Sequence, residues 1–111
     1  DGVPCGNATR ALAESAGLDL QPVSEETKVT DVRGKVTSGE ADVGIVYATD
    51  AAAAGESVES IPIPGAENSP NRYPIAVLSR SSQPDIARQF LDSVTDPDGR
   101  AVLTGYGFGG V

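Results

Sequence analysis

The segment that most constrains the fold runs from Ser38 to Ala51 and reads SGEADVGIVYATDA. Gly39 is typical of the residue that follows a helix end, because a residue without a Cβ readily adopts the left-handed conformation. Val43 to Tyr47 then form a short apolar run, as in strands that are buried on both faces. Thr49 as the cap and Asp50 in the first turn suit the start of another helix. This helix–strand–helix order favours an α/β fold.

Tyr47 is the residue at the carboxyl end of that predicted strand. In open α/β sheets, ligands bind just beyond the carboxyl ends of the strands, which makes Tyr47 the first candidate for a binding site. The alternative is a tyrosine that only closes a core, and the pattern by itself favours that alternative.

Helices and strands are predicted to alternate along the rest of the chain. Helices are expected from a cap at Asn7 to a stop at Gly17, from Val29 to about Thr37, from Asp50 to Ala54, from Pro84 to Val94, and from a cap at Asp96 with Pro97 to Gly105. Strands are expected at Val43–Tyr47, at Val58–Ile63 as an edge strand, and at Tyr73–Leu78. A loop is expected at Pro64–Asn71, a docked end at Tyr106–Phe108 and a loose end at Gly109–Val111. The pattern predicts a single α/β segment over residues 1–111.

The charge balance excludes two classes of partner. Sixteen acidic residues against eight basic ones give the 111-residue chain a net charge of −8. Nucleic acids and anionic membranes select clustered Lys and Arg, so neither is an expected partner. The sequence contains no apolar run of the roughly 20 residues that a membrane helix needs. Because it opens on Asp1 and not on Met, we expect a processed or excised segment of a longer protein.

The residue types present argue against catalysis. The chain contains no His and a single Cys, so it can form neither a Ser–His or Cys–His pair nor a zinc site of His or thiolate ligands. We therefore expect no enzyme, no cofactor and no directly bound metal. Cys5 is either a free thiol or one half of a disulfide whose partner lies outside this segment.

Two helix starts and one tyrosine form the remaining candidate site. They are the turn Pro4–Gly6 before the first helix, the start of the second helix at Val29, and Tyr47. The first N–H groups of a helix have no intrahelical partner and can donate to an oxyanion, and a tyrosine hydroxyl adds a neutral donor. The alternative is that these helix ends are simply capped or hydrated.

Several motifs, taken in order, resemble the second half of the periplasmic molybdate-binding proteins of ABC transporters. The matching stretches are Val3–Leu12, Ser38–Ala51, Tyr73–Leu78, Phe90-Leu91, Asp96-Pro97 and Gly105–Phe108. The resemblance implies the type 2 periplasmic-binding-protein fold, in which two α/β lobes close over a ligand. This chain would contain mostly the second lobe, and the first lobe, which supplies serine hydroxyl ligands in the family, would be absent.

The resemblance also implies a ligand and the groups that hold it. The ligand would be molybdate or tungstate, with molybdenum bound only as its oxyanion. The donors would be the backbone N–H of Cys5, which stands where relatives usually carry Ala, the backbone N–H of Val29, and the hydroxyl of Tyr47. Lys28 stands where relatives often have a small capping residue, which makes Val32 the fallback for Val29.

The partners implied are the permease subunits in the membrane and the missing first lobe of the same protein. The implied location is periplasmic or extracytoplasmic, and a lipid anchor on the full-length protein is compatible with it. In such an oxidising compartment Cys5 would pair with a cysteine upstream, which a thiol titration of the full-length protein tests. Alternatives are another oxyanion, such as sulfate or thiosulfate, and a ligand-sensing effector domain of a transcription regulator.

Overall fold

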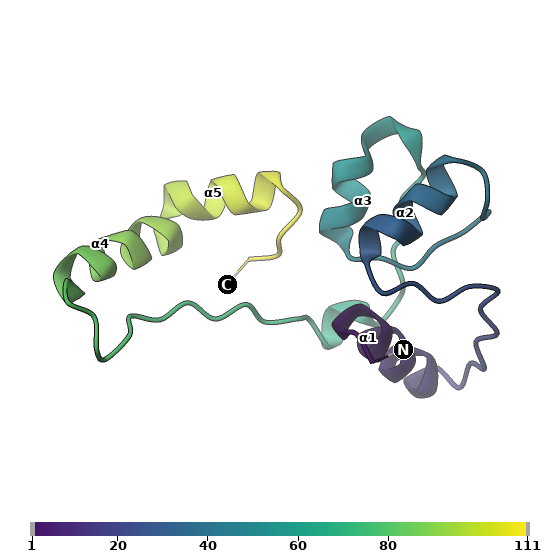
Figure 1. Ribbon diagram of the computed structural model, residues 1–111, viewed down its shortest axis with the longest axis horizontal. Coiled ribbons are helices and arrows are strands. Elements are labelled where there is room, and N and C mark those ends of the chain that lie inside the picture. Colours follow the sequence, from purple (N-terminus) through teal and green to yellow (C-terminus); the bar gives the residue numbers. More distant parts are fainter. Residues whose placement is uncertain (1, 111) are drawn as a thin grey trace. The chain divides into compact units, whose positions relative to one another are not determined.

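The computed structural model describes residues 2–110 and is built from helices joined by coil (Figure 1). The helices are α1 (Pro4–Ser15), α2 (Val29–Thr37), α3 (Ala48–Ala54), α4 (Pro84–Thr95) and α5 (Pro97–Gly105), with short 3-10 turns η1 (Gly55–Ser57) and η2 (Ala66–Asn68). The described residues form two compact units, which meet in the sequence between Ser69 and Pro70. The predicted loose end extends to Val111, which lies outside the described residues.

Helix α2 has the predicted bounds. Asp31 lies in its first turn and Lys35 in its last, the arrangement that favours the helix dipole. Gly39 follows with a φ of +78°, and the Glu40 N–H donates to the Lys35 carbonyl at 2.9 Å. The prediction that Gly39 ends this helix is confirmed, because its positive φ allows the chain to turn back over the last carbonyls.

Helix α1 begins earlier than predicted. Val3 is the extended N-cap residue and Pro4 occupies the first turn, where a missing N–H has no cost. The Asn7 N–H donates to the Val3 carbonyl at 2.9 Å, so Asn7 lies inside the helix and the prediction that it caps the helix is wrong. Gly17 has a φ of +66° after the helix end, as predicted.

Helix α3 also begins earlier than predicted. Its N-cap is Tyr47 and its first residue is Ala48, so the predicted cap at Thr49 is wrong. The Tyr47 carbonyl accepts the N–H groups of Asp50 at 3.0 Å and Ala51 at 3.1 Å. Asp50 does lie in the first turn, as predicted.

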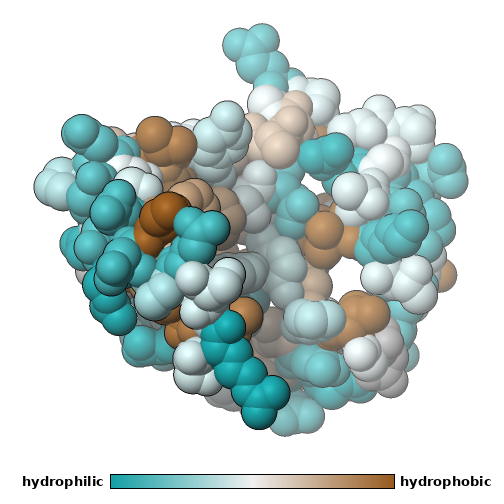
Figure 2. Space-filling model, turned by 60° about the vertical axis from the view of Figure 1, so that its left-hand side comes forward, coloured by the Kyte–Doolittle hydropathy of each residue, from teal (hydrophilic) through white to brown (hydrophobic). Residues whose placement is uncertain are grey.

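The predicted strands are absent from residues 2–110. Val43–Tyr47, Val58–Ile63 and Tyr73–Leu78 all run as coil. A strand exists only when it is hydrogen-bonded to a neighbouring strand, and none of these segments has such a neighbour here. Most of their apolar side chains are exposed, and Figure 2 shows hydrophobic residues at the surface among hydrophilic ones. Among the described residues, Ala13 alone is buried.

The second unit depends on a tight connection between α4 and α5. Pro84 and Pro97 each occupy the first turn of a helix, as predicted. The predicted cap at Asp96 is confirmed as well, because its carboxylate accepts the Gly99 N–H at 2.8 Å. The Arg100 Nε donates to the Thr95 carbonyl at 2.6 Å and further fixes the connection.

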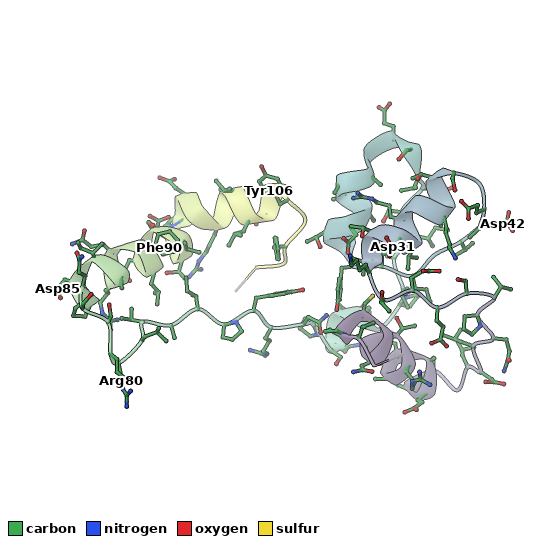
Figure 3. All side chains as sticks on the ribbon, in the orientation of Figure 1. Asp31, Asp42, Arg80, Asp85, Phe90 and Tyr106 are labelled. Carbon is green, nitrogen blue, oxygen red and sulfur yellow. The ribbon has the colours of Figure 1, made fainter. Side chains whose placement is uncertain are left out.

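The predicted docked end is confirmed in part. Phe108 lies edge-to-face against Tyr73, with the ring centroids 5.7 Å apart. Tyr106 is 70% exposed and does not join this contact. Figure 3 shows Tyr106 at the end of α5, Phe90 on α4 and Arg80 projecting from the turn before α4.

The close approach of α5 to α4 predicts the effect of one substitution. A Cβ at Gly99 would overlap the Ser93 carbonyl oxygen and would lie 2.5 Å from that of Val94. Gly99→Ala should therefore lower the free energy of unfolding of the full-length protein by about 1–3 kcal/mol, measured by denaturant titration.

Gly105→Ala is the matched control for Gly99→Ala. Gly105 ends α5 and lacks a positive φ, and a Cβ added to it would meet no atom within 4 Å. This substitution should therefore leave stability unchanged or raised. Equal stabilities of the two variants would contradict the packing described for the α4–α5 connection.

Candidate functional site

The first unit contains a hollow of about 920 Å³, lined by the starts of α1 and α2 and by the coil that leads into α3. The three residues that the sequence singled out, Cys5, Val29 and Tyr47, all line it, as does Val32. Residues separated by more than 40 positions in the sequence thus border one space.

The start of α1 borders this hollow and carries backbone N–H groups. Val3 makes no side-chain cap, and Pro4 has no N–H. Cys5 and Gly6 therefore carry the first N–H groups of the helix, and helix geometry gives these groups no intrahelical acceptor. Both residues line the hollow.

The start of α2 is similar. Lys28 is extended, with φ −132° and ψ 138°, and its side chain does not cap the helix. The N–H groups of Asp31 and Val32 donate to the Lys28 carbonyl at 3.1 and 3.4 Å. Val29, as the first residue of the helix, has an N–H with no intrahelical acceptor. The geometry thus favours Val29 over the fallback Val32 as a donor to a ligand.

The backbone of Tyr47 is fixed because this residue is the N-cap of α3. Its backbone is extended, with φ −73° and ψ 155°, and its carbonyl accepts the first two hydrogen bonds of α3. The tyrosine side chain therefore projects from the point where the coil ends and the helix begins. A phenolic hydroxyl there can both donate and accept a hydrogen bond.

Cys5 connects the start of α1 to the coil before Tyr47. Its Sγ lies 3.9 Å from the Ile45 carbonyl oxygen, as a weak S–H donor, and the Thr9 hydroxyl donates to the Cys5 carbonyl at 2.9 Å. Burial raises the pKa of the Cys5 thiol, and the nearby Asp50 carboxylate raises it further, while Thr9 opposes this rise. The thiol is therefore neutral at pH 7 and adds no negative charge to the hollow. It has no disulfide partner in residues 2–110.

The charged side chains around the hollow nearly balance. Three basic residues line it, together with four acidic ones: Arg10, Lys28, Lys35, Glu14, Asp19, Glu25 and Glu26. Lys35 is already bonded to Glu26 and to the Ser24 hydroxyl. This pairing raises the pKa of Lys35 and lowers the pKa of Glu26. An anion here would therefore depend on neutral N–H and O–H donors, with no surplus of positive charge to attract it.

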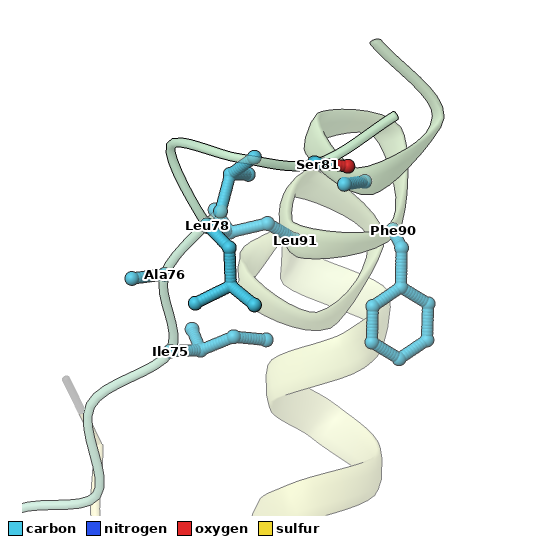
Figure 4. Close-up of a pocket in the computed structure, with 8 residues that line it drawn as sticks. Ile75, Ala76, Leu78, Ser81, Phe90 and Leu91 are labelled. Carbon is cyan, nitrogen blue, oxygen red and sulfur yellow. The ribbon is translucent and has the colours of Figure 1, made fainter. Parts of the chain in front are cut away.

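The second unit offers a different kind of cavity. It has a volume of about 260 Å³ and lies between the coil at residues 75–78 and α4, as the close-up in Figure 4 shows. Ile75, Leu78, Phe90 and Leu91 line it, and Ser81 is its one polar side chain. Such a surface does not suit an oxyanion.

Sequence reasoning missed the residues that support the donors. The Ile45 carbonyl contacts the Cys5 thiol, and Gly44 lies against Val32 and Val36 of α2. A glycine within an apolar strand pattern often marks a close approach of another backbone, and that signal at Gly44 could have predicted the second contact.

The described residues show neither a metal site nor a membrane helix. No group of three His, Cys, Asp or Glu residues between positions 2 and 110 is arranged to hold a metal ion. None of the helices there is both long enough and apolar enough to span a bilayer.

Comparisons with known proteins give consistent results. The molybdate-binding protein ModA of Mycobacterium tuberculosis and that of Mycobacterium bovis are each 49% identical over 106 residues. The alignments cover 96% of this chain and 41% of each relative. ModA of Haemophilus influenzae is 35% identical over 109 residues, which cover 96% of this chain and 42% of that protein.

The chain thus spans about two-fifths of the length of these relatives. No solved structure matches it significantly. The sequence profile of the family described as "Bacterial extracellular solute-binding protein" matches residues 1–109. Because that match covers nearly every residue, the chain belongs to the bacterial extracellular solute-binding protein family.

Proposed function

We propose that the full-length protein is the solute-binding component of an ABC importer and captures molybdate. The donors in this segment are the backbone N–H groups of Cys5 and Val29 and the hydroxyl of Tyr47. The observation that carries the proposal is that these three groups border one hollow without a surplus of positive charge. The names of the relatives, all molybdate-binding proteins, supply the choice of anion.

The chemistry of these donors suits a tetrahedral dianion. Each helix N-terminus carries a partial positive charge as well as N–H groups without intrahelical partners, so two such ends facing one space stabilise an anion. Hydrogen bonds to a charged acceptor are worth about 1.5–3 kcal/mol each, more than those between neutral groups. Tungstate has the same shape and charge and should bind through the same donors.

The remainder of the protein completes the site in this proposal. The coil segments at residues 43–47 and 73–78 expose apolar side chains that strands from the rest of a two-lobed protein would cover. The first lobe supplies the remaining ligands, and the closed complex docks on the permease outside the cytoplasm, with or without a lipid anchor.

Two alternatives keep the fold, and one of them changes the ligand while the other changes the role of the protein. The first is another oxyanion, such as sulfate or thiosulfate, and a competition titration distinguishes it. The second is an effector domain of a transcription regulator. A DNA-binding helix-turn-helix upstream of Asp1 would favour the regulator, whereas a signal peptide or a lipoprotein cysteine would favour the transporter.

Tyr47→Phe tests the hydroxyl. In the full-length protein this substitution should weaken molybdate binding by about 1–3 kcal/mol and leave the unfolding temperature nearly unchanged, because only one hydrogen-bonding group is lost. Isothermal calorimetry gives the affinity. Tyr106→Phe, which alters an exposed tyrosine of the second unit, is the control and should bind like the wild type. If Tyr47→Phe also binds like the wild type, Tyr47 is a structural residue only.

Val29→Pro tests the backbone donor of α2. Proline is favoured at the first helical position, and the extended Lys28 already has the φ and ψ that a residue before proline adopts. The substitution should therefore preserve the helix, remove one N–H and weaken molybdate binding by about 1.5–3 kcal/mol.

Val29→Ala is the control for the proline variant, because it keeps the N–H and removes two methyl groups. It should retain nearly all of the affinity. Equal affinities of the proline and alanine variants would show that this N–H does not contact the anion.

The segment by itself should hold only half of the site. We expect calorimetry of residues 1–111 with molybdate to detect weak binding or none. The full-length protein should gain about 2.7 kcal/mol of stability at a molybdate concentration 100 times its Kd. Tight binding by the segment alone would contradict the two-lobe arrangement.

A further inference from the structure

Gly44 lies in the coil before Tyr47, where the chain passes unusually close to α2. A Cβ at this position would be 2.6 Å from Val32 Cγ1, 3.1 Å from Val36 Cγ2 and 3.7 Å from the Val32 carbonyl oxygen. Ordinary carbon–carbon contacts are about 3.5–4.0 Å, so any side chain at residue 44 would force a displacement of roughly 1 Å.

Glycine is required at position 44 because Val32 and Val36 leave no room for a Cβ, and not because of its backbone conformation. Gly44 is not among the glycines with a positive φ, so its backbone conformation is open to other residues. The atoms that a Cβ would meet belong to two valines, whose branched side chains are stiff about χ1 and cannot easily turn away. The displacement would therefore separate the coil from α2.

This contact lies between two of the proposed donors. Val32 follows Val29 by three residues on α2, which places both on one face of the helix. Tyr47 follows Gly44 by three residues along the coil. Gly44, Val29, Val32 and Tyr47 all line the same hollow. Separating α2 from the coil at residue 44 thus separates the Val29 N–H from the Tyr47 hydroxyl.

The coil also contacts a second helix. Ile45, the next residue, has its carbonyl oxygen 3.9 Å from the Cys5 Sγ at the start of α1. The coil is thus in contact with both α1 and α2. A side chain at Gly44 would therefore widen the contact between this coil and α2.

We propose that Gly44 is a positioning residue that sets the distance between the Val29 N–H and the Tyr47 hydroxyl, and thereby the size of oxyanion that the site accepts. This inference rests on the proposed function. Hydrogen bonds hold only over about 2.7–3.2 Å between heavy atoms, so a displacement of roughly 1 Å is enough to break one of them.

The test compares two glycine-to-alanine variants of the full-length protein. Gly44→Ala should weaken molybdate binding about 10- to 100-fold, the loss of one hydrogen bond to a charged group. Sulfate, which has shorter bonds to its oxygens, should lose more affinity than molybdate, so the ratio of the two affinities should change. Gly34→Ala alters a glycine of α2 at which an added Cβ would meet no atom within 4 Å, and it should leave both affinities within about threefold of the wild type.

A rescue experiment separates positioning from a general loss of packing. Val32→Ala removes the Cγ1 that the new Cβ would meet, so Gly44→Ala combined with Val32→Ala should recover the wild-type ratio of affinities. If Gly44→Ala alone fails to fold, Val32→Ile enlarges the same contact from the side of α2. It should then change the ratio in the same direction.

The outcomes distinguish the proposed molybdate-binding function from the proposed positioning role of Gly44. A wild-type protein that binds neither anion overturns the proposed function, and with it this inference. A wild-type protein that binds molybdate, together with a folded Gly44→Ala variant of unchanged affinity ratio, overturns the inference alone. A variant that loses stability but keeps the ratio also overturns it, because Gly44 would then serve packing only.

Discussion

The candidate site depends on the contacts that the coil at residues 43–47 makes with two helix starts. The Ile45 carbonyl oxygen contacts the Cys5 thiol of α1, and Gly44 lies against Val32 of α2. Neither contact involves a charged group. Together they bring two helix N-termini and Tyr47 to the border of one hollow. The proposed oxyanion site is thus a consequence of close packing between short, locally ordered segments.

In the proposed site, neutral donors would allow an acidic chain to bind an anion. The net charge is −8, and the charged groups around the hollow nearly balance. Salt screens charges that lie more than about 8–10 Å apart, so the distant carboxylates contribute little at the site. In the proposed site the helix ends would act at hydrogen-bonding distance, which is well within the screening length. The raised pKa of the Cys5 thiol would also favour a bound anion, because a neutral thiol does not repel negative charge at the start of α1.

Local sequence signals predicted the helices well and the strands poorly. Helix α2 has the predicted bounds, and the proline and aspartate signals at α4 and α5 are confirmed, since such signals act within one turn. Strands need partners elsewhere in the chain, and Val43–Tyr47 and the other apolar runs have none in residues 2–110. The three candidate ligand residues could be selected from two helix starts and the end of a predicted strand, although that strand is absent from residues 2–110. The glycine within the apolar run signals a close approach at Gly44, but α2 could not be predicted as its partner, because no periodic pattern relates Gly44 to Val32.

The most direct measurement of the central claim is a calorimetric titration of the full-length protein with molybdate, repeated with sulfate as competitor. If neutral donors at two helix starts and a tyrosine capture the anion, one molybdate should bind tightly per protein. Only a large excess of sulfate should displace it. Capture by neutral donors also predicts an affinity that changes little with ionic strength, because no net positive charge attracts the anion. Absence of molybdate binding, or an affinity that collapses as salt is added, would contradict it.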